Sequence, residues 1–153
     1  EWGDFKVKEI DDVRDQWSHY FSRPEQELLI RTTVAALSQN RRKNAPRRLL
    51  FVGGDWHAGG LVEVEMEEEN LTFPCLITSG ISQRTNGDFL ISSVVDMEHE
   101  VAPGIQAKFR TVVTDYNFGL IQLIPTGATP ELMPSVIHKE NASSWGMTAQ
   151  LPI

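Results

Sequence analysis

The stretch that decides the fold is residues 49–60, which read Leu-Leu-Phe-Val-Gly-Gly-Asp-Trp-His-Ala-Gly-Gly. Its first four residues have the composition of a buried β-strand, and the glycines that follow let the backbone turn sharply and a ligand come close. Asp55 and His57 stand two residues apart, so their side chains point the same way if the backbone stays extended. A carboxylate and an imidazole at the end of such a strand are typical of a metal or phosphate site. Asp55 and His57 are therefore the candidate catalytic and metal-binding residues.

A helix is expected before this stretch. Ser22 can cap it, Pro24 suits its first turn and Glu25 completes a Ser-x-x-Glu capping box. The helix is predicted to run to about Asn40 with one apolar stripe, made of Leu29, Ile30, Thr33, Val34 and Leu37. The run 48–53 behind it is short and apolar, which predicts a strand buried on both faces, as in α/β layers.

Strands are expected after the glycines. Residues 61–66 alternate between apolar and acidic side chains, which predicts a half-exposed strand that has Glu63 and Glu65 on its outer face. Residues 67–70 are expected to form a turn and residues 72–79 a further strand, with Pro74 near its start. Cys75 lies in this apolar run, so we expect a buried, inert thiol.

The second half of the chain mixes helical and extended signals. Residues 80–88 read as a loop, and residues 89–99 as a helix that ends in solvated side chains at Glu98-His99-Glu100. From 108 to 124 we predict a hairpin whose turn, 116–119, has Asn117 and Gly119 able to take positive φ. A last strand, 132–138, is expected to be interrupted at Pro134 and to end at a structural histidine, His138.

Composition narrows the class of protein. The chain has 153 residues, 41% of them apolar and 23% charged, as in an ordinary globular domain. A net charge of −7 argues against a nucleic-acid backbone as the main partner, and no apolar stretch is long enough for a membrane span. The first ten residues do not resemble a signal peptide, and the compartment is left open. We divide the chain into an aromatic-rich segment, 1–21, that packs on a partner or on another part of the protein, a main unit, 22–139, and a polar tail, 140–153.

Four motifs follow one another along the chain. They are Asp15-Gln16-Trp17 leading to Arg23-Pro24-Glu25-Gln26, Leu49-Leu50-Phe51-Val52 running into Gly54-Asp55-x-His57, Thr78-Ser79-Gly80-Ile81-Ser82, and Asp115-Tyr116-Asn117-Phe118-Gly119-Leu120. In this order they resemble the C-terminal part of a PhoD-like metallophosphatase of the calcineurin-like phosphoesterase superfamily. The resemblance implies an α/β (mixed α+β) fold, specifically part of a sandwich of mixed β-sheets with flanking helices.

The resemblance also implies a site. By position, His57 would be a metal ligand, and Asp55, which stands where relatives carry a histidine, a ligand or an orienting group. The implied cofactors are two divalent or trivalent metal ions, and the implied substrate is a phosphoester contacted by Ser79, Ser82 and Arg84. The family's upstream motifs, Asp-x-His, Gly-Asp-x-x-Asp and Asn-His-Glu or Asn-His-Asp, do not occur after Glu1. The chain is therefore expected to be one wall of the site, inactive without an N-terminal portion that supplies the other ligands.

A second hypothesis comes from a different class of protein. The chain can instead be a non-catalytic, β-rich interaction or structural module in which Asp55 caps a turn and His57 packs. The aromatic segment 1–21 would then be a docking surface. Association of two copies through exposed strand edges is a third expectation, because unpaired edges invite pairing.

Overall fold

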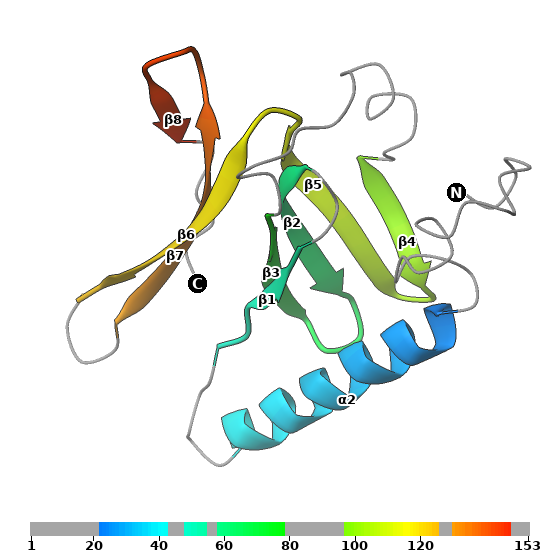
Figure 1. Ribbon diagram of the computed structural model, residues 1–153. Coiled ribbons are helices and arrows are strands. Elements are labelled where there is room, and N and C mark those ends of the chain that lie inside the picture. The colour runs from blue at the N-terminus through cyan, green and yellow to red at the C-terminus, as the bar shows by residue number, and fades with distance from the viewer. Residues whose placement is uncertain (1–21, 43–47, 55–57, 79–96, 126–129, 148–153) are drawn as a thin grey trace, which may run out of the picture.

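The computed structural model describes residues 22–42, 48–54, 58–78, 97–125 and 130–147, which form one helix and eight strands. A larger sheet has the strand order β1-β3-β2-β5-β4 and a smaller sheet the order β6-β7-β8. The helix, α2 (Arg23–Arg42), runs along the larger sheet (Figure 1). The strands of the larger sheet are β1 (Phe51–Gly53), β2 (Gly59–Met66), β3 (Leu71–Ile77), β4 (Glu98–Ala102) and β5 (Ile105–Val113), and those of the smaller sheet are β6 (Asn117–Ile124), β7 (Glu131–Lys139) and β8 (Trp145–Met147). The predicted mixed α/β class is confirmed at this level, with more strand than helix.

Helix α2 forms where the capping signal predicts it. The Gln26 amide donates to the Ser22 carbonyl at 2.9 Å, and the helix ends at Arg42, two residues beyond the predicted end. Ile30, Val34 and Leu37 of the predicted stripe are buried. Leu29, at the margin of the stripe, keeps 42% of its surface exposed, so the buried face is narrower than the sequence predicts.

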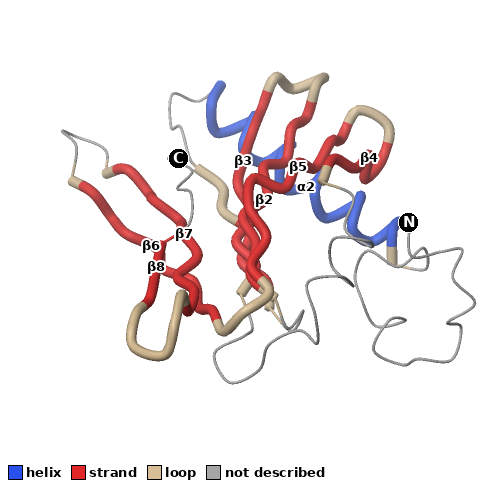
Figure 2. Tube along the Cα trace, turned by 90° about the horizontal axis from the view of Figure 1, so that it is seen from above, coloured by secondary structure: helices blue, strands red, loops and turns tan. Residues whose placement is uncertain are grey.

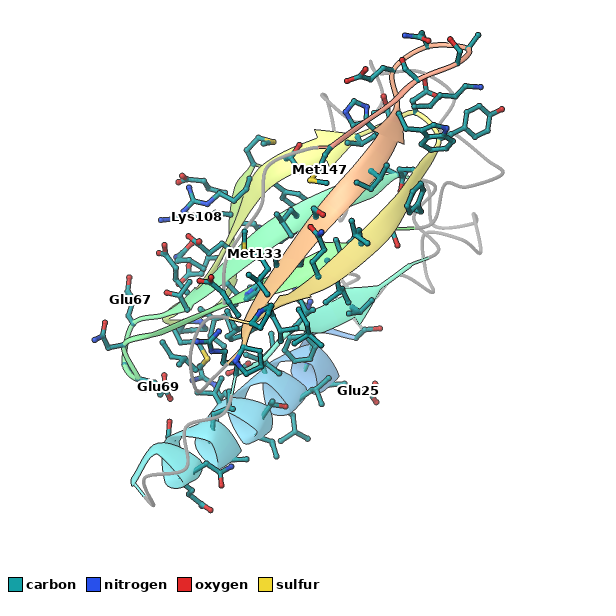
Figure 3. All side chains as sticks on the ribbon, turned by 90° about the vertical axis from the view of Figure 1, so that its left-hand side faces the viewer. Glu25, Glu67, Glu69, Lys108, Met133 and Met147 are labelled. Atoms are coloured by element: carbon teal, nitrogen blue, oxygen red, sulfur yellow. The ribbon has the colours of Figure 1, made fainter. Side chains whose placement is uncertain are left out.

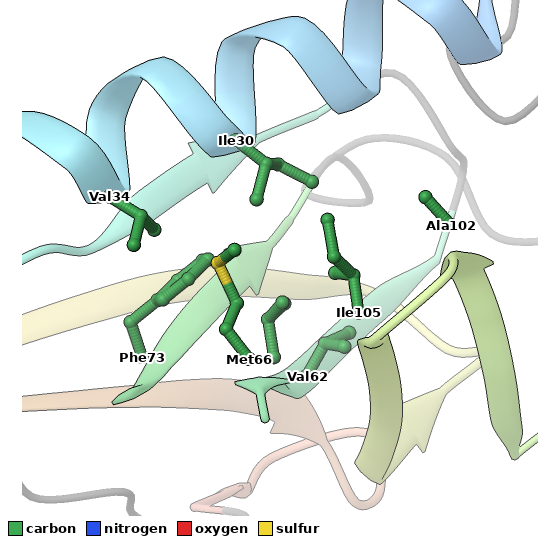
Figure 4. Packing of buried hydrophobic residues seen from close by; sticks show 8 residues of the cluster. Ile30, Val34, Val62, Met66, Phe73, Ala102 and Ile105 are labelled. Carbon is green, nitrogen blue, oxygen red and sulfur yellow. The ribbon is translucent and has the colours of Figure 1, made fainter. Parts of the chain in front are cut away.

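The main core lies between α2 and the larger sheet. Ile30 and Val34 pack from the helix onto apolar side chains of β2, β3, β4 and β5 (Figure 4). The buried members of this cluster are Ile30, Val34, Val62, Val64, Met66, Phe73, Ala102 and Ile105. The Phe73 ring also meets the Phe51 ring, with centroids 5.5 Å apart, which ties β1 to the same core.

The predicted alternation in β2 is confirmed. Val62, Val64 and Met66 face the helix and are buried, while Glu63 and Glu65 lie on the opposite face. Lys108 Nζ donates to Glu65 Oε2 at 3.0 Å, and the Arg110 guanidinium pairs with Glu63. The acidic stripe that the sequence places outside is thus matched across the strands by cations of β5.

Strand β1 is shorter and more open than predicted. It pairs in parallel with β3, and the other pairings of the larger sheet are antiparallel, so the sheet is mixed. The prediction of burial on both faces is wrong: Phe51 packs against the core, but Val52 is 61% exposed. The reason is positional, because β1 is the last strand at its edge of the sheet among the described residues.

The predicted helix 89–99 is wrong in the part that the structure describes. Glu98 and His99 lie in β4, whose residues alternate in burial, and Pro103 and Gly104 turn the chain into β5. Gly104 has φ 76°, which favours glycine over other residues. Glu98-His99-Glu100 is therefore an edge strand rather than the end of a helix.

The predicted hairpin 108–124 is also wrong, although both strands exist. β5 pairs with β2 and β4, whereas β6 pairs with β7, so the chain changes sheets at residues 114–116. Asn117 and Gly119 lie within β6, and neither has positive φ. At this corner the Tyr116 amide donates to Asp115 Oδ1 and Asn117 Nδ2 donates to the Asp115 carbonyl.

The smaller sheet covers one end of the larger sheet, on the face away from α2 (Figure 2). The contact is an apolar cluster formed by Leu61, Leu76, Val113 and Val136. Strand β7 runs through Pro134 without the predicted interruption, since Pro134 still pairs with Ile121. The sequence did not predict strand β8. Its Trp145 ring meets the Phe118 ring, with centroids 5.4 Å apart. Figure 3 views the smaller sheet face-on, with Met133 and Met147 labelled.

Candidate functional site

Two strand ends meet where the sequence predicts the site. Gly53 at the end of β1 is in register with Ile77 at the end of β3, and the Thr78 amide donates to the Gly53 carbonyl at 3.0 Å. The segments that follow these strands therefore start side by side. The first of them carries the predicted metal-binding residues and the second the predicted substrate-binding residues. All five, Asp55, His57, Ser79, Ser82 and Arg84, lie outside the described residues.

The corner between β5 and β6 lies at the same place. A Cβ atom on Gly119 would come within 2.9 Å of Thr78 Cγ2 and 3.0 Å of Leu76 Cδ2. A Cβ atom on Gly59 would come within 2.8 Å of both Asn117 Oδ1 and Val136 Cγ1. Glycine at these two positions allows the corner to sit directly on the strands that bear the predicted site.

Hydrogen bonds hold this corner in shape. The Tyr116 amide donates to Asp115 Oδ1 at 2.7 Å, and Asn117 Nδ2 donates to the Asp115 carbonyl at 2.9 Å. The Lys139 amide donates to the Tyr116 carbonyl at 2.9 Å, and Lys139 Nζ lies 5.1 Å from the centre of the Tyr116 ring. Residues of β6 and β7 therefore hold the corner in shape.

Asn117 is a site residue that the sequence reasoning missed. It was expected to form a turn, yet its side chain is fully buried and its Oδ1 atom has no hydrogen-bond partner. His138 lies opposite Asn117 in register, so the two side chains share the face that looks toward the larger sheet. The available signal was a polar amide at the head of a mostly apolar run, Asn117 to Ile124.

The described residues do not by themselves form a metal site. No group of three or more His, Cys, Asp or Glu side chains within them is placed to hold a metal ion. The donors that fit a metal here are the imidazole of His57 and the carboxylate of Asp55, a nitrogen and oxygen pair suited to zinc, iron or manganese.

Cys75 lies on β3, and burial raises the pKa of its thiol to about 11. The thiol therefore stays protonated at neutral pH, and the prediction of an unreactive cysteine agrees with this environment.

The charged face of β2 and β5 is a separate feature. Hydrogen bonds to Glu65 and Glu63 raise the pKa values of Lys108 and Arg110, respectively. These pairs are open to solvent and satisfy one another, so this face is a solvated sheet surface rather than a site.

Comparison of the chain with protein-family models, curated proteins and solved structures finds no match. The resemblance to PhoD-like metallophosphatases therefore remains a hypothesis based on the four motifs. In the part of the chain that the structure describes, no helix is long and apolar enough to cross a membrane.

Proposed function

We propose that the chain is the C-terminal part of a PhoD-like, metal-dependent phosphoesterase that hydrolyses a phosphomonoester or phosphodiester. His57 and Asp55 would bind two divalent or trivalent metal ions together with ligands from an N-terminal portion. The finer fold that goes with this proposal is part of a metallophosphatase sandwich, of which the two sheets and α2 would be one side.

One observation carries the proposal: segments far apart in the sequence meet at one end of the larger sheet. Residues 49–57, Thr78 and residues 115–120 each belong to a motif of the resemblance, and the register and the contacts of Gly54 and Gly119 with Thr78 bring their described parts together. Ligands in open sheets with parallel strands bind at the carboxyl ends of those strands. The parallel pair β1 and β3 ends here.

The chemistry divides among this chain's residues as follows. When bound, a metal pair of this kind polarises the phosphoryl oxygens and lowers the pKa of a bound water. His57 and Asp55 would hold and orient that pair. Arg84 would pair with phosphate oxygens through its planar guanidinium, and Ser79 and Ser82 would donate hydroxyl hydrogen bonds to them.

The open edge of β1 supports the idea of a missing portion. In the described part of the chain, β1 has β3 as its sole neighbour, and Val52 is exposed on it. Ile121 and Leu123 of β6 are also exposed, and they lie on the same face of the smaller sheet as Val136, which packs on the larger sheet. A segment along β1 would cover these apolar side chains and bring its own ligands beside Asp55 and His57.

The test is metal-dependent thermal stability of the purified chain. A ligand that binds only the native state raises the melting temperature by mass action. We expect excess Mn²⁺ or Zn²⁺ to raise it in the wild type and in His99→Ala, whose histidine lies in β4 at the other edge of the sheet. His57→Ala should abolish the shift. An equal shift in His57→Ala would refute the metal site, and strong phosphodiesterase activity of this chain alone would refute the incomplete site.

The second candidate is the β-rich interaction module. It is favoured by the outer face of the smaller sheet, where Phe118, Ile124, Trp145 and Met147 are exposed together. A monomeric domain seldom leaves large apolar side chains grouped in this way without a partner. If no metal changes the melting temperature and Trp145→Ser abolishes self-association in sedimentation experiments, this candidate replaces the first.

A further inference from the structure

The outer edges of the two sheets differ in length and charge. In the described part of the chain these edges are β1, β4, β6 and β8. Strands β1 and β8 have three residues each, and β4 exposes Glu98 and Glu100. Strand β6 has eight residues, Asn-Phe-Gly-Leu-Ile-Gln-Leu-Ile, without a charge or a proline. Proteins usually protect a sheet edge with charges, a proline or a very short strand, and β6 is the one described edge without such protection.

The backbone of β6 presents a regular set of hydrogen-bonding groups at this edge. Its pairing with β7 is in register over all eight residues, and just before them the Lys139 amide donates to the Tyr116 carbonyl. Hydrogen-bonded pairs alternate along an antiparallel ladder, so the N–H and C=O groups of Gly119, Ile121 and Leu123 point away from β7. These three residues are exposed, and their backbone groups are therefore open to a further strand.

Both faces of β6 carry exposed apolar side chains. Phe118 and Ile124 lie on the outer face of the sheet, with 37% and 36% of their surface exposed. Ile121 and Leu123 lie on the inner face, the one toward the larger sheet, with 44% and 66% exposed. The far ends of β6 and β7 stand apart from the larger sheet (Figure 1, Figure 2). A strand added at this edge would cover apolar side chains on both faces.

We propose that the free edge of β6 is the interface of a symmetric dimer, in which β6 of a second copy adds antiparallel and Ile121 lies opposite Ile121. A two-fold axis brings the same edge of both copies together. Asn117 is fully buried, so its backbone is closed to a second copy. The longest symmetric register that leaves Asn117 out is centred on Ile121. This register places Phe118 opposite Ile124 on the outer face.

Charge favours a second copy as the occupant of this edge. The chain has a net charge of −7, so two copies repel each other unless they meet at an uncharged surface. The strand β6 supplies such a surface, and the symmetric register sets apolar side chains against apolar side chains. At the edge of β4, the same symmetry would bring Glu98 and Glu100 of two copies together, where like charges destabilise the pairing. The dimer does not depend on metal binding.

The first experiment measures association of the 153-residue chain by sedimentation velocity over a dilution series. We expect a monomer–dimer equilibrium in the wild type. Ile121→Lys removes an apolar contact and sets two ammonium groups opposite each other, so the dimer should weaken more than about tenfold. Ile121→Glu should weaken it in the same way. An equimolar mixture of these two variants should restore a dimer, because opposite charges then face each other.

The matched control is Leu28→Lys. It adds the same charge at an exposed position of α2, away from β6, and should leave the dimer unchanged. Circular dichroism checks the fold of each variant. If Ile121→Lys does not fold, hydrogen exchange of the wild type decides the proposal.

The second experiment follows hydrogen exchange of the β6 amides by NMR at increasing protein concentration. The amides of Gly119, Ile121 and Leu123 should exchange more slowly as the concentration rises, because the second strand covers them. The amides of Leu120 and Gln122 face β7 and should exchange slowly at every concentration. This alternation distinguishes pairing at the edge from contact through a face of the sheet, and it needs no substitution.

Several results would overturn the proposal. They are a wild type that stays monomeric up to about 1 mM, a dimer that Ile121→Lys leaves unchanged, and a mixture of the two charged variants that stays monomeric. Edge amides that exchange equally slowly at all concentrations would assign the edge to another segment of the same protein. A dimer lost in Trp145→Ser but kept in Ile121→Lys would place the contact on the outer face instead.

Discussion

Replacing Gly59 by alanine tests the contact that joins the corner to the candidate site. The new methyl group would come within 2.8 Å of Asn117 Oδ1 and Val136 Cγ1, closer than real Cβ contacts allow. Asn117 and Val136 are both fully buried, so neither can swing into solvent. Forcing an extra carbon into a packed contact typically costs about 1–3 kcal/mol. For a chain of this size that lowers the melting temperature by roughly 2–12 °C.

Gly53 supplies the matched control at the other end of the same turn. A Cβ there would meet nothing within 4 Å, and its φ is not in the left-handed region. Gly53→Ala should therefore be neutral or stabilise the chain by about 0.4–1 kcal/mol, because it reduces the freedom of the unfolded chain. Both variants are compared by urea unfolding monitored by tryptophan fluorescence and circular dichroism. If Gly59→Ala is as stable as Gly53→Ala, the close approach of Asn117 to Gly59 is wrong.

Four further substitutions probe the fold. Phe73→Ala, in the core beneath α2, should destabilise the chain by about 3–5 kcal/mol in urea unfolding, whereas Phe118→Ala on the outer face should cost far less. Between the ordinary pKa of Cys75, 9.0, and its native value of about 11, unfolding releases a proton, so the unfolding free energy should fall as pH rises through this window. Cys75→Ala should remove that slope. Glu65→Gln breaks a solvent-open pair and should change stability by less than about 1 kcal/mol, with the difference vanishing in high salt.

The elements that the sequence predicted well are those whose signal is local. The capping residues and the apolar spacing of α2 act within one helix, and the strict alternation of β2 needs only one covered face. The turn at residues 67–70 also matches its prediction, with Asn70 at φ 47°, a conformation that asparagine tolerates. Each of these structures is determined by residues that are close together in the sequence.

The failures concern which strand lies next to which. Two apolar runs joined by Asp-Tyr-Asn look the same in sequence whether they pair as a hairpin or enter different sheets. The pairing of β5 with β2 is decided by distant residues. The predicted burial of Val52 was wrong for the same reason, because an apolar residue does not reveal whether its strand is central or at the edge of the sheet. The meeting of the β1 and β3 ends with the corner depends on this topology, and so the geometry of the candidate site was not predictable from the motifs.

Gly59 links the two sheets to the candidate site. In the larger sheet it pairs with Val113, the last residue of β5, and its α-carbon also lies against Asn117, the first residue of β6. The chain thus leaves one sheet and enters the other at two residues that both contact Gly59. Any change that shifts the smaller sheet must then move the end of the β1–β2 turn, because that end is held from both sides. This coupling holds whether the turn binds a metal or only packs, because it rests on the contacts of Gly59 with both sheets.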